Sequence, residues 1–156
     1  MRYIRIIVYV FLLVLLFSCN ESGQKMKIIY YDKGNVKNVD TSNLELTAIF
    51  NRIGKICFNT TQILRVHIND ERIEQLKQEE SGVEFILNKE IIIQSTKFGK
   101  YNVKKIFFPL SGDFIGNDES PVITVFLGKE SYYPDALRNM EGYKELKELV
   151  NVVIKK

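Results

Sequence analysis

"VEFILNKEIIIQSTKFGKYNVKKIFFPL", residues 83–110, decides the fold class because it contains three successive runs that are typical of β-strands. The runs at 83–87, 91–94 and 101–110 are rich in Val, Ile, Phe and Tyr, and a fourth follows at 122–127. The segments NKE, KFGK and SGDFIGNDESP that separate them are typical of turns and loops. These strands in succession favour an antiparallel meander, with Pro109 at a strand end or a sheet edge.

Helical spacing occurs on both sides of this stretch. Ser42 and Glu45 have the spacing of a capping box, and apolar residues follow at i, i+3, i+4 and i+7, so we expect a helix that stops at Gly54. A surface helix is expected over 70–80 and another helix over 143–153. Strands are expected at 28–31, 36–39 and 62–68.

This order of elements predicts an α+β fold in a single domain at 27–156. We expect a mixed or mainly antiparallel sheet of about five to six strands, with two to three helices packed against it. A domain of this length buries about two-thirds of the surface that its unfolded chain exposes, which is enough for independent folding.

The N-terminus has the pattern of a signal peptide. Arg2 and Arg5 precede an apolar run at 6–17 that is too short to span a bilayer, and the small residue Ser18 follows it. We expect residues 1–18 to be removed on export. Residues 19–26 are then a short polar tether in front of the domain.

The end of this segment resembles the lipobox of bacterial lipoproteins, and the matching residues are Leu16, Phe17, Ser18 and Cys19. The resemblance implies cleavage before Cys19, a diacylglycerol on its sulfur and a fatty acid such as palmitate on its new amino group. It therefore implies a lipid-anchored protein of the cell envelope. Asn20 is not the aspartate that is associated with inner-membrane retention, which favours the outer membrane in a cell with two membranes.

Charge and cysteine content change once the signal is removed. The full chain has 22 basic and 19 acidic residues, and the loss of Arg2 and Arg5 lowers its net charge from +3 to about +1. The chain has no long basic run, so we do not expect a nucleic-acid partner. With Cys19 lipidated, Cys57 has no cysteine partner within the chain and is expected to be a small buried apolar side chain.

The sequence contains few groups that could carry catalysis. His67 is the only histidine, and Ser111 lacks the G-x-S-x-G motif of a serine hydrolase. The loop 111–120 collects the oxygen donors that calcium prefers, although it does not match the D-x-[DN]-x-[DN]-G pattern and such residues also suit a solvated turn. Its candidate ligands are Asp113, Asn117, Asp118 and Glu119. We expect no metal and no cofactor, and a non-enzymatic function is favoured.

The stretch 128–143 is the candidate surface for a protein partner because tyrosine, arginine and methionine are enriched in interfaces. Its candidate residues are Tyr132, Tyr133, Leu137, Arg138 and Met140. The alternative is that the two tyrosines fold back and cover a sheet edge. The sequence therefore favours a membrane-anchored envelope lipoprotein whose domain binds or inhibits another macromolecule. Two alternatives stay open: an envelope hydrolase or cation-binding domain that uses loop 111–120, and a structural component of the cell envelope.

Overall fold

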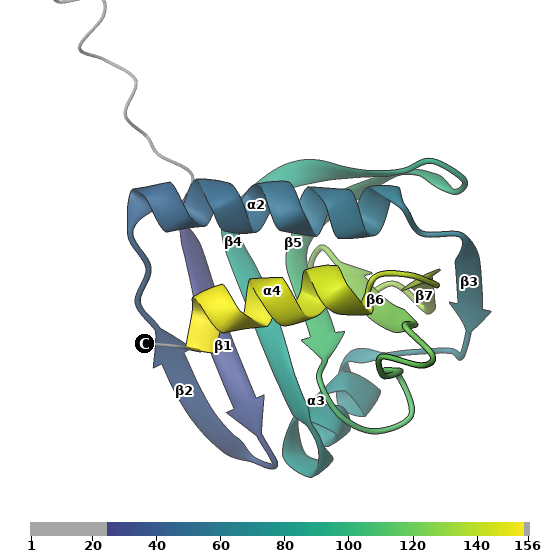
Figure 1. The fold of residues 1–156 in the computed structure, drawn as a ribbon, viewed down its shortest axis with the longest axis horizontal. Helices are drawn as coiled ribbons and strands as arrows, with labels where there is room; N and C mark the ends of the chain where they lie inside the picture. Colours follow the sequence, from purple (N-terminus) through teal and green to yellow (C-terminus); the bar gives the residue numbers. More distant parts are fainter. Residues whose placement is uncertain (1–24, 155–156) are drawn as a thin grey trace, which may run out of the picture.

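The structure is a computed structural model that describes residues 25–154. The predicted signal peptide, the lipobox with Cys19, and residues 20–24 of the tether lie outside these residues. The described elements, shown in Figure 1, are β1 (Met26–Asp32), β2 (Asn35–Val39), α2 (Asn43–Phe58), β3 (Gln62–Arg65), α3 (Asp70–Glu79), β4 (Ser81–Ser95), β5 (Gly99–Pro109), β6 (Ile123–Gly128), β7 (Asp135–Asn139) and α4 (Tyr143–Ile154).

The strands form one antiparallel sheet in the order β2-β1-β4-β5-β6-β7-β3. The prediction of an α+β fold is confirmed, but the expected count of about five to six strands is wrong, since the sheet has seven. The strand that raises the count is β7, which lies in the stretch 128–143, where the sequence predicts no strand. Its sequence DALRN has little β propensity, and it is a strand because it pairs with β6 on one side and with β3 on the other.

The runs 83–87 and 91–94 belong to one long strand, β4, and are not separated by a turn at NKE. The register between β4 and β5 shifts between Ile86 and Ile91, so the extra residues form an irregularity within the strand. Pairing with β1 continues there, because Met26 lies opposite Leu87 and the Asn88 N–H donates to the Lys25 carbonyl at 3.1 Å.

Helices cover both faces of the sheet (Figure 1), with α2 and α4 on one face and α3 on the other. The capping box of Ser42 and Glu45 is present at the start of α2. The predicted stop at Gly54 is wrong, since the helix continues to Phe58. Burial of Ile56 and Cys57 in the core outweighs the cost of about 1 kcal/mol of a glycine inside a helix.

Because both faces of the sheet are buried, the run 106–108 is apolar throughout and does not alternate between apolar and polar residues. Phe108 packs into the core beneath α2 and α4, whereas its neighbour Phe107 packs into the core beneath α3. Both rings are fully buried. Pro109 is the last residue of β5, as predicted for a residue that cannot donate a hydrogen bond to a neighbouring strand.

Candidate functional site

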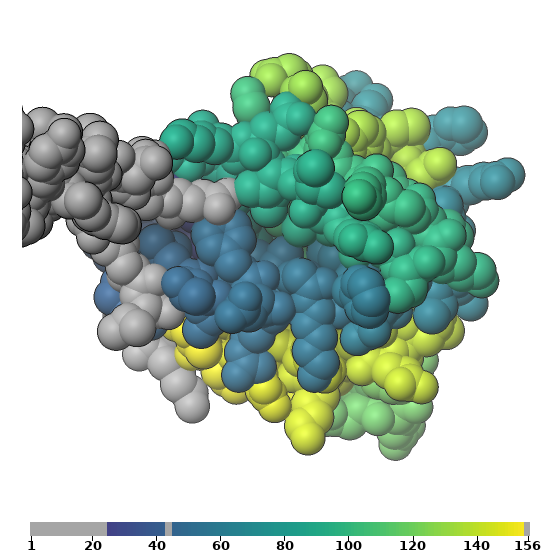
Figure 2. Space-filling model, turned by 90° about the horizontal axis from the view of Figure 1, so that it is seen from above, coloured from purple at the N-terminus to yellow at the C-terminus, as the bar shows by residue number. Residues whose placement is uncertain are grey.

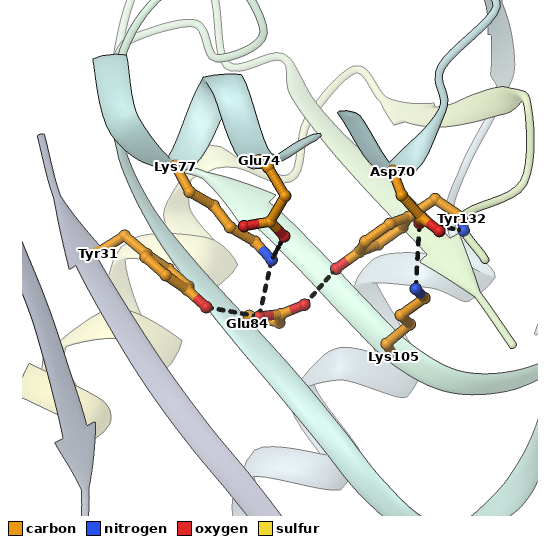
Figure 3. A network of polar contacts seen from close by, with 7 residues as sticks. All are labelled: Tyr31, Asp70, Glu74, Lys77, Glu84, Lys105 and Tyr132. Carbon is orange, nitrogen blue, oxygen red and sulfur yellow. Dashed lines mark hydrogen bonds and ion pairs between the residues drawn. The ribbon is translucent and has the colours of Figure 1, made fainter. Parts of the chain in front are cut away.

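The most organised polar cluster is a buried network between α3 and the sheet (Figure 3). Glu84 on β4 is 4% exposed and Lys77 on α3 is 3% exposed. Glu84 Oε2 accepts a hydrogen bond from the Tyr31 hydroxyl at 2.8 Å and lies 3.0 Å from Lys77 Nζ. The other carboxylate oxygen, Oε1, accepts from the Tyr132 hydroxyl at 2.6 Å. Lys77 also pairs with Glu74 at 2.7 Å.

The protonation of the network follows from these contacts. Burial by itself raises the pKa of Glu84, but the hydrogen bonds from Tyr132 and Tyr31 and the charge of Lys77 lower it below its ordinary value. Burial, reinforced by the Glu84 carboxylate, raises the pKa of Tyr31 and of Tyr132. At neutral pH, Glu84 is therefore an ionised acceptor between two protonated tyrosines.

A second contact fixes the start of α3. Asp70 Oδ1 accepts a hydrogen bond from the Tyr132 backbone N–H at 2.9 Å and lies 3.1 Å from Lys105 Nζ on β5. Burial raises the pKa of Asp70, but the Tyr132 N–H and Lys105 together lower it. Tyr132 therefore hydrogen-bonds to Asp70 of α3 through its backbone and to Glu84 of β4 through its side chain.

The network joins α3 to the sheet through contacts that leave no partner of Glu84 outside the protein. Both oxygens of Glu84 have donors, and no buried side-chain polar atom of the described residues lacks a hydrogen-bond partner. None of the three pockets described below is lined by Glu84, Lys77, Tyr31 or Tyr132. The hydrogen-bonding capacity of the Glu84 carboxylate is therefore used within the protein.

The five predicted partner-binding residues differ in how far they are buried. Tyr132 and Leu137 are buried, at 6% and 2% exposure, so neither side chain can contact a partner in this fold. For Tyr132, the alternative that it folds onto the sheet describes the structure better. Tyr133 and Arg138 are half-buried, and Met140 is 37% exposed.

Tyr133 and Met140 each lie in a groove, but the two grooves are different. Tyr133 lies in a groove of about 540 Å³ next to the outer half of β5, together with Ile92, Lys100 and Tyr101. Met140 lies in a mainly polar pocket of about 390 Å³ between the end of α2 and the start of α4. The predicted residues therefore do not form one surface.

The acidic loop does not gather its oxygen donors around one point. Asp118 pairs with Lys147 of α4 at 2.6 Å, and the Asn117 side-chain oxygen accepts from the backbone N–H groups of Glu119 and Ser120. Asp113 is exposed. Within residues 25–154, no group of three or more His, Cys, Asp or Glu side chains is placed to hold a metal ion.

The same loop instead forms one wall of an apolar groove of about 200 Å³ along α4. We call it the α4 groove. One wall consists of Ile115 of this loop and Leu110 directly before the loop. Its helix wall consists of Tyr143, Leu146, Lys147, Val150 and Asn151.

The α4 groove lies on the side of α4 that faces away from α2. Glu145 and Glu148, on the opposite side of the helix, pair with Lys55 and Arg52 of α2. Apolar side chains on the groove side are therefore not covered by the neighbouring helix. Sequence reasoning missed this groove, although Phe114 and Ile115 within an otherwise polar loop were a signal that the loop packs against an apolar surface.

The remaining sequence candidates have structural or exposed positions. Cys57 is fully buried, as expected, and burial raises the pKa of its thiol to about 12. His67 is exposed beyond the end of β3, with φ of 47°. The Ser111 hydroxyl donates to Glu80 at 2.6 Å and accepts from the Ser81 N–H at 2.8 Å, which joins the end of β5 to the start of β4.

The chain matches no protein-family model, no curated protein and no solved structure. Among residues 25–154, no helix is long and apolar enough to cross a membrane.

Proposed function

We propose that this protein is a lipid-anchored protein of the cell envelope whose α+β domain binds another protein through the α4 groove. The observation that carries the proposal is the groove itself, which is lined mainly by apolar side chains from two segments and opens away from α2. Exposed apolar grooves with a polar rim are typical of sites for protein partners.

The charges around the α4 groove support a partner of particular chemistry. Asp113, Asp118 and Glu119 are exposed on the loop that forms one wall, and Lys147 is the basic residue that pairs with one of them. A partner that places an apolar side chain in the groove and basic side chains against this loop would be complementary in both respects.

The lipid anchor is proposed from the signal-peptide pattern and the lipobox that ends at Cys19. Two or more acyl chains hold a protein on a bilayer far more firmly than one chain. The measurement is the intact mass of the protein purified from envelopes. A chain that starts at Cys19 with added lipid mass supports the anchor, and an unmodified chain that starts at Met1 contradicts it.

Binding through the α4 groove can be tested by comparing two variants of the full chain. Val150→Glu places a charge in the groove, whereas Val36→Glu places the same charge on β2, where the side chain is 59% exposed. Each protein serves as bait for detergent-solubilised envelope proteins. A partner retained by the wild type and by Val36→Glu but lost with Val150→Glu supports the proposal. Retention of the same proteins by all three baits, with circular dichroism unchanged, contradicts it.

A further inference from the structure

The end of the molecule at which β1 begins carries a basic and partly apolar surface, which we call the tether-end face. Figure 2 looks onto this end and shows the β4–β5 hairpin and α2 lying side by side across it. The exposed residues that define the face are Lys25, Phe58, Lys89, Ile92, Lys97 and Lys100.

Hydrogen bonds join the parts of this face. The Lys25 N–H donates to the Asn88 side chain at 3.0 Å and the Asn88 N–H donates to the Lys25 carbonyl at 3.1 Å, which places Lys25 beside the outer part of β4. At the hairpin tip, the Thr96 N–H donates to the Phe58 carbonyl at 3.0 Å and Lys97 Nζ donates to the Thr61 carbonyl at 3.0 Å. The hairpin is therefore fixed to the C-terminal end of α2.

Positive charge dominates the tether-end face. Between residues 88 and 102, the hairpin has three lysines and one acidic residue, Glu90, which is paired with Lys129 at 2.8 Å. Lys25 adds a further positive charge at the start of β1. The exposed residues of α2 at positions 47 and 51 are the uncharged Thr47 and Asn51. One further acidic residue, Asp135, is exposed and lines the groove that also contains Ile92 and Lys100. The lysines of the face therefore outnumber the acidic side chains beside them.

Apolar and aromatic groups lie among these lysines. Ile92 is 64% exposed and Phe58 is 46% exposed. Beside Ile92, the rings of Tyr101 and Tyr133 form a tilted pair with centroids 5.9 Å apart at the rim of the 540 Å³ groove. Lysine, tyrosine and exposed aliphatic side chains together are characteristic of surfaces that lie at a membrane–water interface.

The length of the tether limits how far this face can be from a lipid anchor. Six residues, 20–25, separate Cys19 from the start of β1 at Met26. Fully extended, they reach about 20 Å. β1 starts at the end of the sheet that carries the hairpin (Figure 1), so this end of the domain would be the one held next to the bilayer.

We infer that the tether-end face lies on the bilayer and binds anionic phospholipid headgroups, with Ile92 at the interface. This inference rests on the lipid anchor of the proposed function. Lysines supply an attraction to anionic headgroups that adds to the anchor and weakens with salt. In this orientation, the α4 groove stays on another side of the domain and is open to a protein partner.

The chain contains no tryptophan, so a single introduced tryptophan reports on one position. The lipidated full chain carrying Ile92→Trp is reconstituted into vesicles of phosphatidylethanolamine and phosphatidylglycerol, with quenching by brominated lipid as the readout. Val36→Trp, at a 59% exposed position near the opposite end of the sheet, is the matched control. We expect quenching at position 92 that exceeds the control by about twofold or more, with a blue-shifted emission.

Charge is tested in the same background. Lys89→Gln, Lys97→Gln and Lys100→Gln together should reduce the quenching of Ile92→Trp to the level of the control, as should the replacement of phosphatidylglycerol by phosphatidylcholine. The substitutions Lys33→Gln, Lys37→Gln and Lys144→Gln remove the same charge outside the tether-end face and should leave the quenching of Ile92→Trp unchanged. Equal quenching at positions 92 and 36 in a chain with lipid on Cys19 overturns the inference that the tether-end face lies on the bilayer, but not the lipid anchor. A chain without lipid on Cys19 overturns both.

Discussion

The hydroxyl of Tyr132 donates a hydrogen bond to the carboxylate of Glu84 across 48 residues of sequence, at 2.6 Å and within the core. The same residue donates its backbone N–H to Asp70 at the start of α3. A loop residue thus joins the helix on one face of the sheet to the strand beneath it. Since loops seldom contribute buried side chains, the position of α3 depends on a segment that sequence patterns mark as surface.

Tyr132→Phe removes one donor from a buried carboxylate and should lower the free energy of unfolding by about 1.5–3 kcal/mol. Tyr133→Phe is the matched control, because its hydroxyl donates to the exposed Asn102 carbonyl at 2.6 Å and its loss should cost less than about 1 kcal/mol. Urea unfolding followed by circular dichroism measures both variants. Equal losses would show that the Tyr132 hydroxyl has no special role.

The ion pair between Lys77 and Glu84 should behave as a coupled unit. Glu84→Gln leaves the buried Lys77 with Glu74 as its remaining acidic partner and should lower the free energy of unfolding by about 3 kcal/mol. Lys77→Met should cost a similar amount, because it leaves a buried carboxylate charge. The double variant should lose less than the sum of the two, by about 1 kcal/mol or more. Additive losses would contradict the coupling.

The pKa of Glu84 predicts how stability depends on pH. A carboxyl whose pKa is lower in the folded than in the unfolded chain contributes stability above the unfolded value, and loses it as pH falls through the folded value. The unfolded value for glutamate is about 4.3. The difference in unfolding free energy between wild type and Glu84→Gln should therefore be constant above about pH 5 and shrink below it. A difference that persists unchanged at acid pH would contradict the lowered pKa.

Local signals in the sequence were sufficient for some elements and not for others. Ser42 and Glu45 predicted the start of α2 correctly because a capping box depends only on residues three positions apart. The end of α2 could not be predicted from Gly54, because the last turn is held by burial of Ile56 and Cys57 against distant strands. In the same way, β7 is a strand only through its neighbours β6 and β3.

The polar network shows the same limit. Glu84 lies in an apolar strand run, and Lys77 lies beside Leu76 and one turn after Ile73, so both occupy positions where a charge is unusual. These oddities can be seen in the sequence, but the partner that each charge needs comes from another element. The α4 groove likewise combines Ile115 of a loop with Val150 of a helix. Sites of this kind require the tertiary fold.

Calcium should not stabilise the protein. Asp118 is paired with Lys147, and the Asn117 side-chain oxygen accepts from the loop's own backbone. Within residues 25–154, no group of three or more His, Cys, Asp or Glu side chains is placed to hold a metal ion. We expect the same thermal midpoint in calcium and in chelator. Asp118→Ala should change the free energy of unfolding by less than about 1 kcal/mol, because its ion pair is exposed. A rise in the midpoint with calcium that Asp118→Ala abolishes would restore the cation-binding alternative.

Thiol labelling tests the core and the anchor in one measurement. Cys57 is fully buried and its pKa is raised to about 12, so at pH 8 the thiol is protonated and inaccessible. We expect no reaction of Cys57 with an aromatic disulfide reagent in the native protein and complete reaction in denaturant. The chain has 2 cysteines, so an unfolded chain with lipid on Cys19 should yield a single thiol and an unmodified chain should yield both. Rapid labelling of Cys57 in the native protein would mean that the core between the sheet and α2 opens far more readily than its packing predicts.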